Sequence, residues 1–152
     1  MSLKGIPLSV RSLSREFVFK FLYHTIFESD KDLSELTIEN VKNEMGLFEN
    51  SIDLPTDKLD RDFIASSCHL ALTHHSEIKI LIEKYLRKWK WERINSIDKT
   101  ILIAAISEMN YQKDIPHPVI INEYLDLAKK YGNENSKNFI NGTLDNISKN
   151  EF

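Results

Sequence analysis

The side chains that most often carry catalysis or bind metals are poorly arranged in this sequence of 152 residues. Two metal ligands share one face of a helix when they are three or four residues apart. No two of the five histidines have this spacing; they are His24, His69, His74, His75 and His117. Cys68 is followed directly by His69, and neighbouring side chains on a helix diverge, so the two form no nucleophile–base pair. The four glycines are isolated, which excludes a glycine-rich phosphate loop. We therefore predict no enzyme, no cofactor and no metal site.

Basic and aromatic residues near the N-terminus have a chemistry suited to RNA. Arg11 and Arg15 are four residues apart and would share one face of a helix. Guanidinium groups bind phosphates through forked hydrogen bonds, and the ring of Tyr23 would support a splayed base. With Lys4 and Lys20 these residues are candidates for RNA contact. The alternative is a solvated first turn with Tyr23 packed inside the protein.

The last third of the chain predicts two short helices with a joint between them. Gly132 follows two cations, Lys129 and Lys130, and Tyr131. This arrangement is typical of a helix end, where glycine is free to adopt a positive φ. Asn135 or Ser136 would cap the second helix. Gly142 interrupts that helix at a cost of about 1 kcal/mol relative to alanine, which suggests that another backbone passes close to it.

This joint is the second candidate for RNA contact. Asn135 and Phe139 are four residues apart and would share an exposed face. Single-stranded RNA is commonly held by bases stacked on aromatic rings and by polar contacts to base edges. The candidate residues are Tyr131, Asn135, Lys137 and Phe139. The alternative places Phe139 in the core and gives Asn135 only a capping role.

The segment Lys84–Arg93 interleaves basic residues with aromatic residues, as grooves that follow a nucleic-acid backbone do. The simpler interpretation is structural: Trp91 plugs the helical bundle, and the cations flank it in solvent. We favour the structural interpretation and leave this segment out of the predicted site.

Helical periodicity and capping residues predict helices along the chain, and no alternating strand pattern of useful length is present. The predicted helix starts are Ser12 or Ser14, Ser34, Thr56 or Asp57, Ser76, Asn95 or Ser96, Pro118, and Asn135 or Ser136. The helix that ends near Met109 is apolar around most of its circumference, which indicates a central position. We predict an all-α fold of about seven helices in two packed bundles. It forms one domain over residues 1–152, with sub-bundles at about 12–75 and 76–149.

Composition fits one small globular domain, with 41% apolar and 28% charged residues. The net charge is -3, but it is unevenly distributed: residues 28–62 carry eleven acids and four cations, whereas residues 79–93 carry six cations and two acids. A mildly acidic protein of this kind can still present a basic surface. There is no apolar run long enough to span a membrane, no pattern of a secretory signal, and a single cysteine, so we expect a cytoplasmic protein.

Several short motifs keep their order and spacing over more than fifty residues in the C-terminal half. They are Arg93-Ile94, Asp98-Lys99, Ile101-Leu102, Glu108-Met109, Asp114-Ile115-Pro116, Ile121-Asn122-Glu123, Leu127-Ala128-Lys129 and Phe139-Ile140-Asn141-Gly142. In these motifs the segment from about Trp91 to Ile147 resembles the C-terminal half of the NusB family of bacterial transcription antitermination factors. Arg15-Glu16 and Leu22-Tyr23 match further toward the N-terminus. The resemblance implies the same two-bundle, all-α fold.

The resemblance also implies a function. NusB-like factors bind boxA-type RNA together with NusE, a small ribosomal subunit protein, and join the RNA polymerase antitermination complex that supports ribosomal RNA transcription. The family carries an arginine-rich N-terminal segment that binds RNA, and here Ser12, Leu13 and Ser14 stand where it often has more basic residues. The family's joint near Asn135 is implicated in RNA contact and usually has an acidic residue there. A neutral amide should remove repulsion from phosphate.

Two alternatives remain open from the sequence. A helical protein-interaction adaptor that has lost RNA binding fits the thinned N-terminal arginines and the acidic net charge. A similar helical domain precedes the catalytic part of some ribosomal RNA cytosine methyltransferases, although this sequence has no methyl-donor module. The choice between a monomer and a homodimer also stays open.

Overall fold

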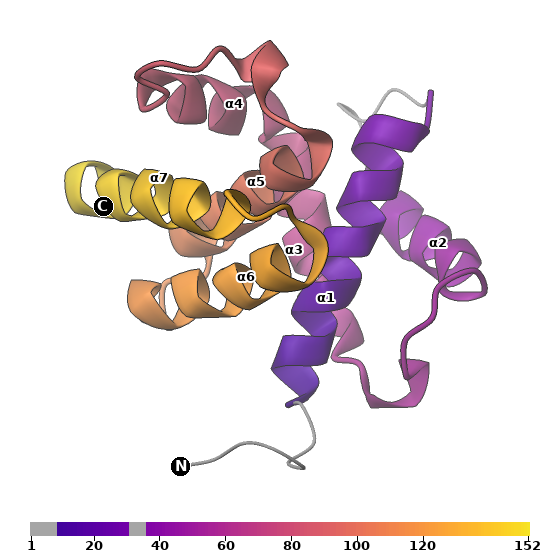
Figure 1. Ribbon diagram of the computed structural model, residues 1–152. Helices are drawn as coiled ribbons and strands as arrows, with labels where there is room; N and C mark the ends of the chain where they lie inside the picture. The colour runs from indigo at the N-terminus through magenta and orange to yellow at the C-terminus, as the bar shows by residue number, and fades with distance from the viewer. Residues whose placement is uncertain (1–8, 31–35) are drawn as a thin grey trace.

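The structure is a computed structural model that describes residues 9–30 and 36–152, and in these residues it contains seven α-helices and no strand (Figure 1). The helices are α1 (Val10–Tyr23), α2 (Ile38–Glu49), α3 (Arg61–Thr73), α4 (His75–Lys84), α5 (Ser96–Tyr111), α6 (His117–Tyr131) and α7 (Ser136–Glu151). Three single turns join them: the π-helical η1 (His24–Glu28) and the 3-10 turns η2 (Thr56–Lys58) and η3 (Trp91–Arg93). The predicted all-α class is confirmed.

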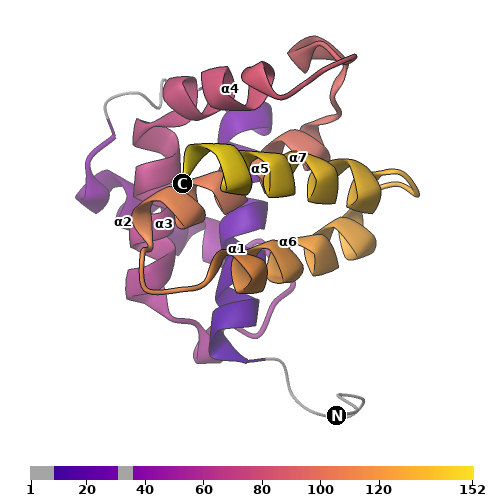
Figure 2. The same ribbon diagram turned by 90° about the vertical axis from the view of Figure 1, so that its left-hand side faces the viewer.

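Helix α5 is the centre of the molecule. It contacts α1, α3, α4, α6 and α7, and every residue from Thr100 to Met109 is buried. In Figure 1, α1 runs past it, with α2 on one side and the helices α4–α7 on the other. Figure 2 shows α6 and α7 side by side, joined by a short turn at one end of the molecule. The prediction of a surrounded central helix is confirmed. The division into two sub-bundles stays a prediction, with its boundary at the α3–α4 junction.

Side-chain caps start four of the described helices, α1, α2, α3 and α5, and only some of these caps were predicted correctly. Asn95 caps α5 as expected, since its Oδ1 accepts a hydrogen bond from the Asp98 amide at 2.8 Å. Helix α1 begins earlier than predicted, because Ser9 caps it by accepting from the Ser12 amide at 3.0 Å. The Ser14 hydroxyl donates to the Val10 carbonyl inside the helix instead of capping it.

The starts of α2 and α3 also differ from the prediction. Thr37 caps α2 in a reciprocal capping box with Asn40. Ser34, the predicted cap, lies outside the described residues. Asp60 caps α3 by accepting from the Phe63 amide at 3.1 Å, whereas the predicted caps at 56–57 belong to the separate turn η2.

Two glycines play different roles from those predicted. Gly132 ends α6 with a φ of -83° and a ψ of -176°, so it does not adopt the positive φ that the sequence suggested. It is required for space instead: an added Cβ would lie 2.5 Å from the Ser136 Oγ and 2.7 Å from the Ala128 carbonyl oxygen. A Cβ at Gly142 would meet nothing within 4 Å, so the predicted close backbone is wrong. Gly132 thus lets α7 fold back closely against the end of α6.

Candidate nucleic-acid interface

Tyr131, at the end of α6, is held in a fixed orientation. Its hydroxyl donates a hydrogen bond to a carboxylate oxygen of Glu16 on α1. Its ring packs against Phe19, with 5.1 Å between the ring centroids. Burial and then the hydrogen bond to Glu16 raise the pKa of Tyr131, so the phenol stays neutral. A ring anchored at both its edge and its face forms a preorganised surface for stacking.

The spacing of α1 explains why these groups meet. Glu16, Phe19 and Lys20 are three and four residues apart and project from one side of the helix. The Glu16 side chain is only 3% exposed and also forms an ion pair with Lys130, whose Nζ lies 2.7 Å from the Glu16 Oε2. The Lys20 ammonium lies 5.3 Å from the centroid of the Tyr131 ring. A positive charge therefore sits over the aromatic surface.

A hollow of about 380 Å³, here called the tyrosine hollow, opens beside these residues. Its lining combines four aromatic rings with one isoleucine and the lysine: Phe19, Lys20, Tyr23, Phe48, Ile97 and Tyr131. His24 and Glu28, which pair with each other at 3.3 Å, also line it. Apart from Glu28, the composition suits a base stacked on a ring with its phosphate near a cation.

Two further hollows continue the tyrosine hollow along the surface. The middle hollow, about 380 Å³, shares Tyr23, Ile97 and Tyr131 with it and adds Asn95, Ser96, Gly132 and Asn133. The tryptophan hollow, about 240 Å³, shares Asn95 and Asn133 with the middle hollow and adds Trp89, Arg93, Ile94, Asp98, Asn135 and Phe139. The three form one groove, which follows the N-terminal end of α5 and the joint between α6 and α7. The groove brings Lys20 and Tyr23 of the first predicted RNA-contact region together with part of the second, which is Tyr131, Asn135 and Phe139.

The joint presents Asn135 to solvent. Asn135 occupies the N-cap position of α7, but its side chain makes no capping hydrogen bond. Asn133 and Ser136 close the turn instead: the Asn133 amide donates to the Ser136 Oγ at 3.0 Å, and the Asn135 amide donates to the Asn133 Oδ1 at 2.8 Å. The Asn135 side chain is therefore exposed and lines the tryptophan hollow together with Phe139, which is half-buried. Lys137 is exposed on the first turn of α7, outside the residues that line the groove.

Arg15 does not lie on the surface, which corrects the prediction that it contacts RNA. Its side chain is 3% exposed, and its guanidinium holds Glu108 of α5 through two nitrogens, with the shortest contact at 2.6 Å. It also pairs with Glu123 of α6 at 3.3 Å. The Tyr124 hydroxyl donates to the same Glu108 at 3.2 Å. Although burial acts to lower it, the hydrogen bond and charge of Glu108 raise the pKa of Arg15.

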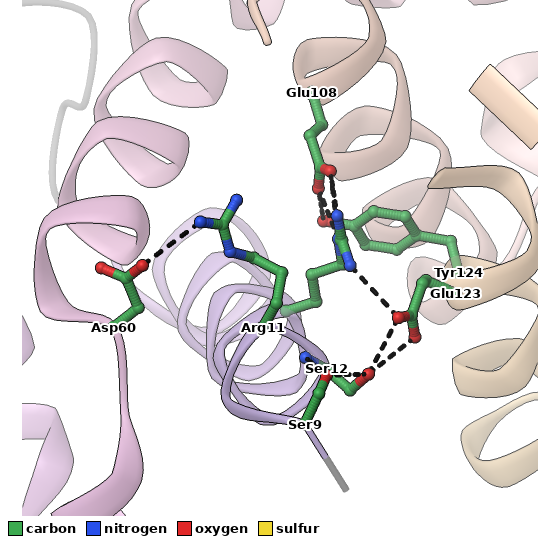
Figure 3. A network of polar contacts seen from close by, with 8 residues as sticks. Ser9, Arg11, Ser12, Asp60, Glu108, Glu123 and Tyr124 are labelled. Atoms are coloured by element: carbon green, nitrogen blue, oxygen red, sulfur yellow. Dashed lines mark hydrogen bonds and ion pairs between the residues drawn. The ribbon is translucent and has the colours of Figure 1, made fainter. Parts of the chain in front are cut away.

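Figure 3 shows this network where α1 meets α5 and α6. The Ser12 hydroxyl donates to the Glu123 carboxylate, with distances of 2.8 and 3.0 Å to its two oxygens. Arg11 lies one turn earlier on α1 and points toward α3, paired with Asp60 at 3.3 Å and stacked 4.1 Å from the centroid of the Phe63 ring. Arg11 is partly exposed, but it is not among the residues that line the groove. Lys4 lies outside the described residues.

The two tryptophans of the segment Lys84–Arg93 differ in exposure. Trp91 is buried in η3 with the Lys99 ammonium 5.0 Å from its ring centroid, as the structural interpretation expected of a plug. Trp89, two residues earlier, is 58% exposed and lines the groove with Arg93. The sequence carried the relevant signal in the alternation of basic and aromatic residues. Nothing in that alternation separated the outward ring from the inward one.

Other chemistry finds no support in the described part of the chain. No group of three or more histidine, cysteine, aspartate or glutamate residues there could hold a metal ion. Cys68 is buried, and burial raises the pKa of its thiol well above the ordinary range, which makes it a poor nucleophile. None of the described helices is both long and apolar enough to cross a membrane.

Comparison with known proteins gives one consistent result. The NusB family model matches residues 12–149. The transcription antitermination protein NusB of Agathobacter rectalis is 36% identical over 134 residues, which cover 88% of this chain and 95% of the relative. NusB of T. maritima is 32% identical in its solved structure, with a TM-score of 0.74 over 92% of this chain and 91% of that chain.

A further solved structure shares the fold at lower identity. It contains the antitermination factors NusB and NusE in complex with dsRNA, and one of its chains is 24% identical to this one. The TM-score is 0.69, and the match covers 92% of this chain and 96% of that chain.

Proposed function

The chain belongs to the NusB family, and from this membership we propose that it is a transcription antitermination factor that binds boxA-type RNA in the groove. The observation that carries the proposal is the continuity of the groove. Its lining places Lys20, Tyr23 and Tyr131 on one surface with Asn135 and Phe139. These are the residue types that hold single-stranded RNA by phosphate contact, stacking and contact to base edges.

The mechanism is binding without catalysis. Contacts between cations and phosphates provide affinity that falls as salt rises, because binding releases counterions from the RNA. Stacking on Tyr131 and polar contacts from Asn135 provide preference among sequences. The anchoring of Tyr131 by Glu16 and Phe19 reduces the entropy that its ring loses on binding.

The partner in this proposal is NusE. Support comes from the family and from the structure of NusB and NusE with dsRNA, which shares this chain's fold. The pair would enter the RNA polymerase antitermination complex in the cytoplasm, where nascent ribosomal RNA carries the boxA-type sequence.

A titration tests the proposal against the alternative of an adaptor that has lost RNA binding. Fluorescently labelled boxA-type RNA and a scrambled RNA of equal length are titrated with the protein, with and without NusE, at fixed salt. We expect tighter binding of the boxA-type RNA and a further gain with NusE. Equal, weak binding of both RNAs in both conditions would support the adaptor and overturn the proposal.

A further inference from the structure

Trp89 is an exposed aromatic residue that packing does not explain. It lies in the loop between α4 and η3 and is 58% exposed, whereas Trp91 already fills the core position nearby. Its ring lines the tryptophan hollow with Arg93, Asn135 and Phe139. The hollow joins the rest of the groove through Asn95 and Asn133.

The charge around Trp89 favours a polyanion. The loop and η3 present four exposed cations, which are Arg87, Lys88, Lys90 and Arg93, against one exposed acid, Glu92. Asp98 also lines the hollow, but it is buried in the first turn of α5, where a carboxylate is favoured by the helix dipole. An exposed ring with cations on both sides is suited to single-stranded nucleic acid more than to an apolar protein surface.

We propose that the RNA track extends past Asn135 to Trp89 and Arg93, where the indole stacks on a base and the guanidinium contacts a phosphate. This inference rests on the proposed function, since it adds a second end to the same groove. In this arrangement the tyrosine hollow holds one part of the RNA and the tryptophan hollow holds another. Asn95 and Asn133 line both the middle hollow and the tryptophan hollow and so lie between the two ends, whereas Asn135 lies in the tryptophan hollow.

Stacking at Trp89 gives a direct signal. The chain has two tryptophans, and the buried Trp91 provides an internal reference. We expect RNA to quench the emission of the wild-type protein, and we expect Trp89→Phe to lose most of this quenching while it still binds RNA. A quench that persists in Trp89→Phe would contradict stacking at this position.

Affinity measurements test the energetic contribution. Trp89→Ala should weaken the binding of boxA-type RNA by about 5- to 150-fold, the effect of losing one stacked base. Ile80→Ala is the matched control, because Ile80 is an apolar residue of α4 that is 68% exposed and does not line the groove. Arg93→Gln should weaken binding and reduce its salt dependence, whereas Arg87→Gln, in the loop before η3 and outside the lining, should change both less.

Nested RNAs shortened from either end locate the contact. Shortening from one end should abolish the effect of Trp89→Ala, and shortening from the other should preserve it. Wild-type binding with no effect of Trp89→Ala on any RNA would overturn this inference and leave the proposed function standing. If Trp89→Ala weakened NusE binding and left RNA binding unchanged, the surface would be a protein-docking site and the inference would also fall. An absence of RNA binding by the wild type would remove the proposed function itself.

Discussion

Arg15 and Glu108 form a buried ion pair at the point where α1 crosses α5, and the pair is completed by Glu123 and Tyr124. Such pairs add little net stability when both partners are present, but the loss of one partner leaves a buried charge without compensation. The surroundings of a residue therefore decide whether an arginine serves the fold or a ligand. Arg15 serves the fold.

Removal of Arg15 should thus reduce stability strongly. We expect Arg15→Met to lower the free energy of unfolding by about 3–5 kcal/mol, because Glu108 would stay buried without its partner. Urea denaturation followed by circular dichroism measures this change. Arg11→Met is the control, since the partly exposed Arg11–Asp60 pair should contribute at most about 1 kcal/mol. A loss below about 1 kcal/mol for Arg15→Met would contradict the structural role.

The residue with the clearest expected effect on RNA is Asn135. A carboxylate at this exposed groove position would repel phosphate. Asn135→Asp should therefore lower the affinity for boxA-type RNA several-fold at low salt and less at high salt. Asn138→Asp adds the same charge at an exposed position of α7 that does not line the groove, and it should have a smaller effect. Fluorescence anisotropy at two salt concentrations compares the variants. Equal or tighter binding by Asn135→Asp would refute the role of the amide.

Asn135, Phe139, Arg11 and Arg15 show which side-chain positions could be predicted from sequence spacing and which could not. The four-residue spacing of Asn135 and Phe139 predicted a shared exposed face; both residues line the tryptophan hollow, although Phe139 is half-buried. The spacing of Arg11 and Arg15 suggested a shared face, but the partner of Arg15 is 93 residues away, on a helix whose pattern was apolar. Local periodicity carries no information about such a distant partner.

At the scale of elements, the joint between α6 and α7 shapes the groove. Gly132 and Asn133 line the middle hollow, and the close approach of Ser136 to Gly132 fixes the path of the chain between the helices. The sequence predicted a glycine-terminated helix followed by a capped one, and both helices are present. It could not predict that Gly132 is needed for space rather than for a positive φ, because that depends on where Ser136 folds back.

Two glycine substitutions separate these roles. Gly132→Ala would bring a Cβ to 2.5 Å from the Ser136 Oγ, so it should destabilise the protein by about 1–3 kcal/mol and weaken RNA binding through the displaced joint. Gly142→Ala meets no atom within 4 Å inside α7 and should stabilise the protein by about 0.5–1 kcal/mol. Denaturation and RNA titration of both variants provide the comparison. A Gly132→Ala protein of wild-type stability would show that the joint tolerates a side chain.

The start of α4 should make stability depend on pH. His75 is partly buried, and its Nε2 has no hydrogen-bond partner. Burial and then the charge of Lys79 lower the pKa of His75 in the folded protein. Below the ordinary value of about 6.5 the unfolded chain therefore binds a proton more readily than the folded one, and stability falls as pH decreases through that value.

The contribution of His75 can be isolated by substitution. The free energy of unfolding should decrease between about pH 7 and pH 5, and His75→Gln should decrease less over the same range. If the free energy of unfolding changed by the same amount in the wild type and in His75→Gln, protonation of His75 would not contribute to the pH dependence of stability.

At the scale of the whole molecule, the central helix α5 connects the stability of the fold to the groove. The same helix holds Glu108 in the core and presents Asn95, Ser96 and Ile97 at its N-terminal end to the middle hollow. The sequence predicted the all-α class and the central position of this helix from its apolar circumference. It did not predict that the basic segment before α5 would reach the same surface as the α6–α7 joint, because that juxtaposition arises only from packing.

The most direct test of the central claim is the salt dependence of RNA binding by wild-type protein and by Lys20→Gln, measured by anisotropy with boxA-type RNA in the presence of NusE. Lys20 lines the tyrosine hollow beside Tyr131, whereas the control Lys113 follows the opposite end of α5. We expect affinity to fall as salt rises, and we expect Lys20→Gln to reduce the logarithmic slope by about 0.7 while Lys113→Gln leaves it unchanged. Affinity that is independent of salt, or equal slopes for all three proteins, would contradict the assignment of the groove as the RNA site.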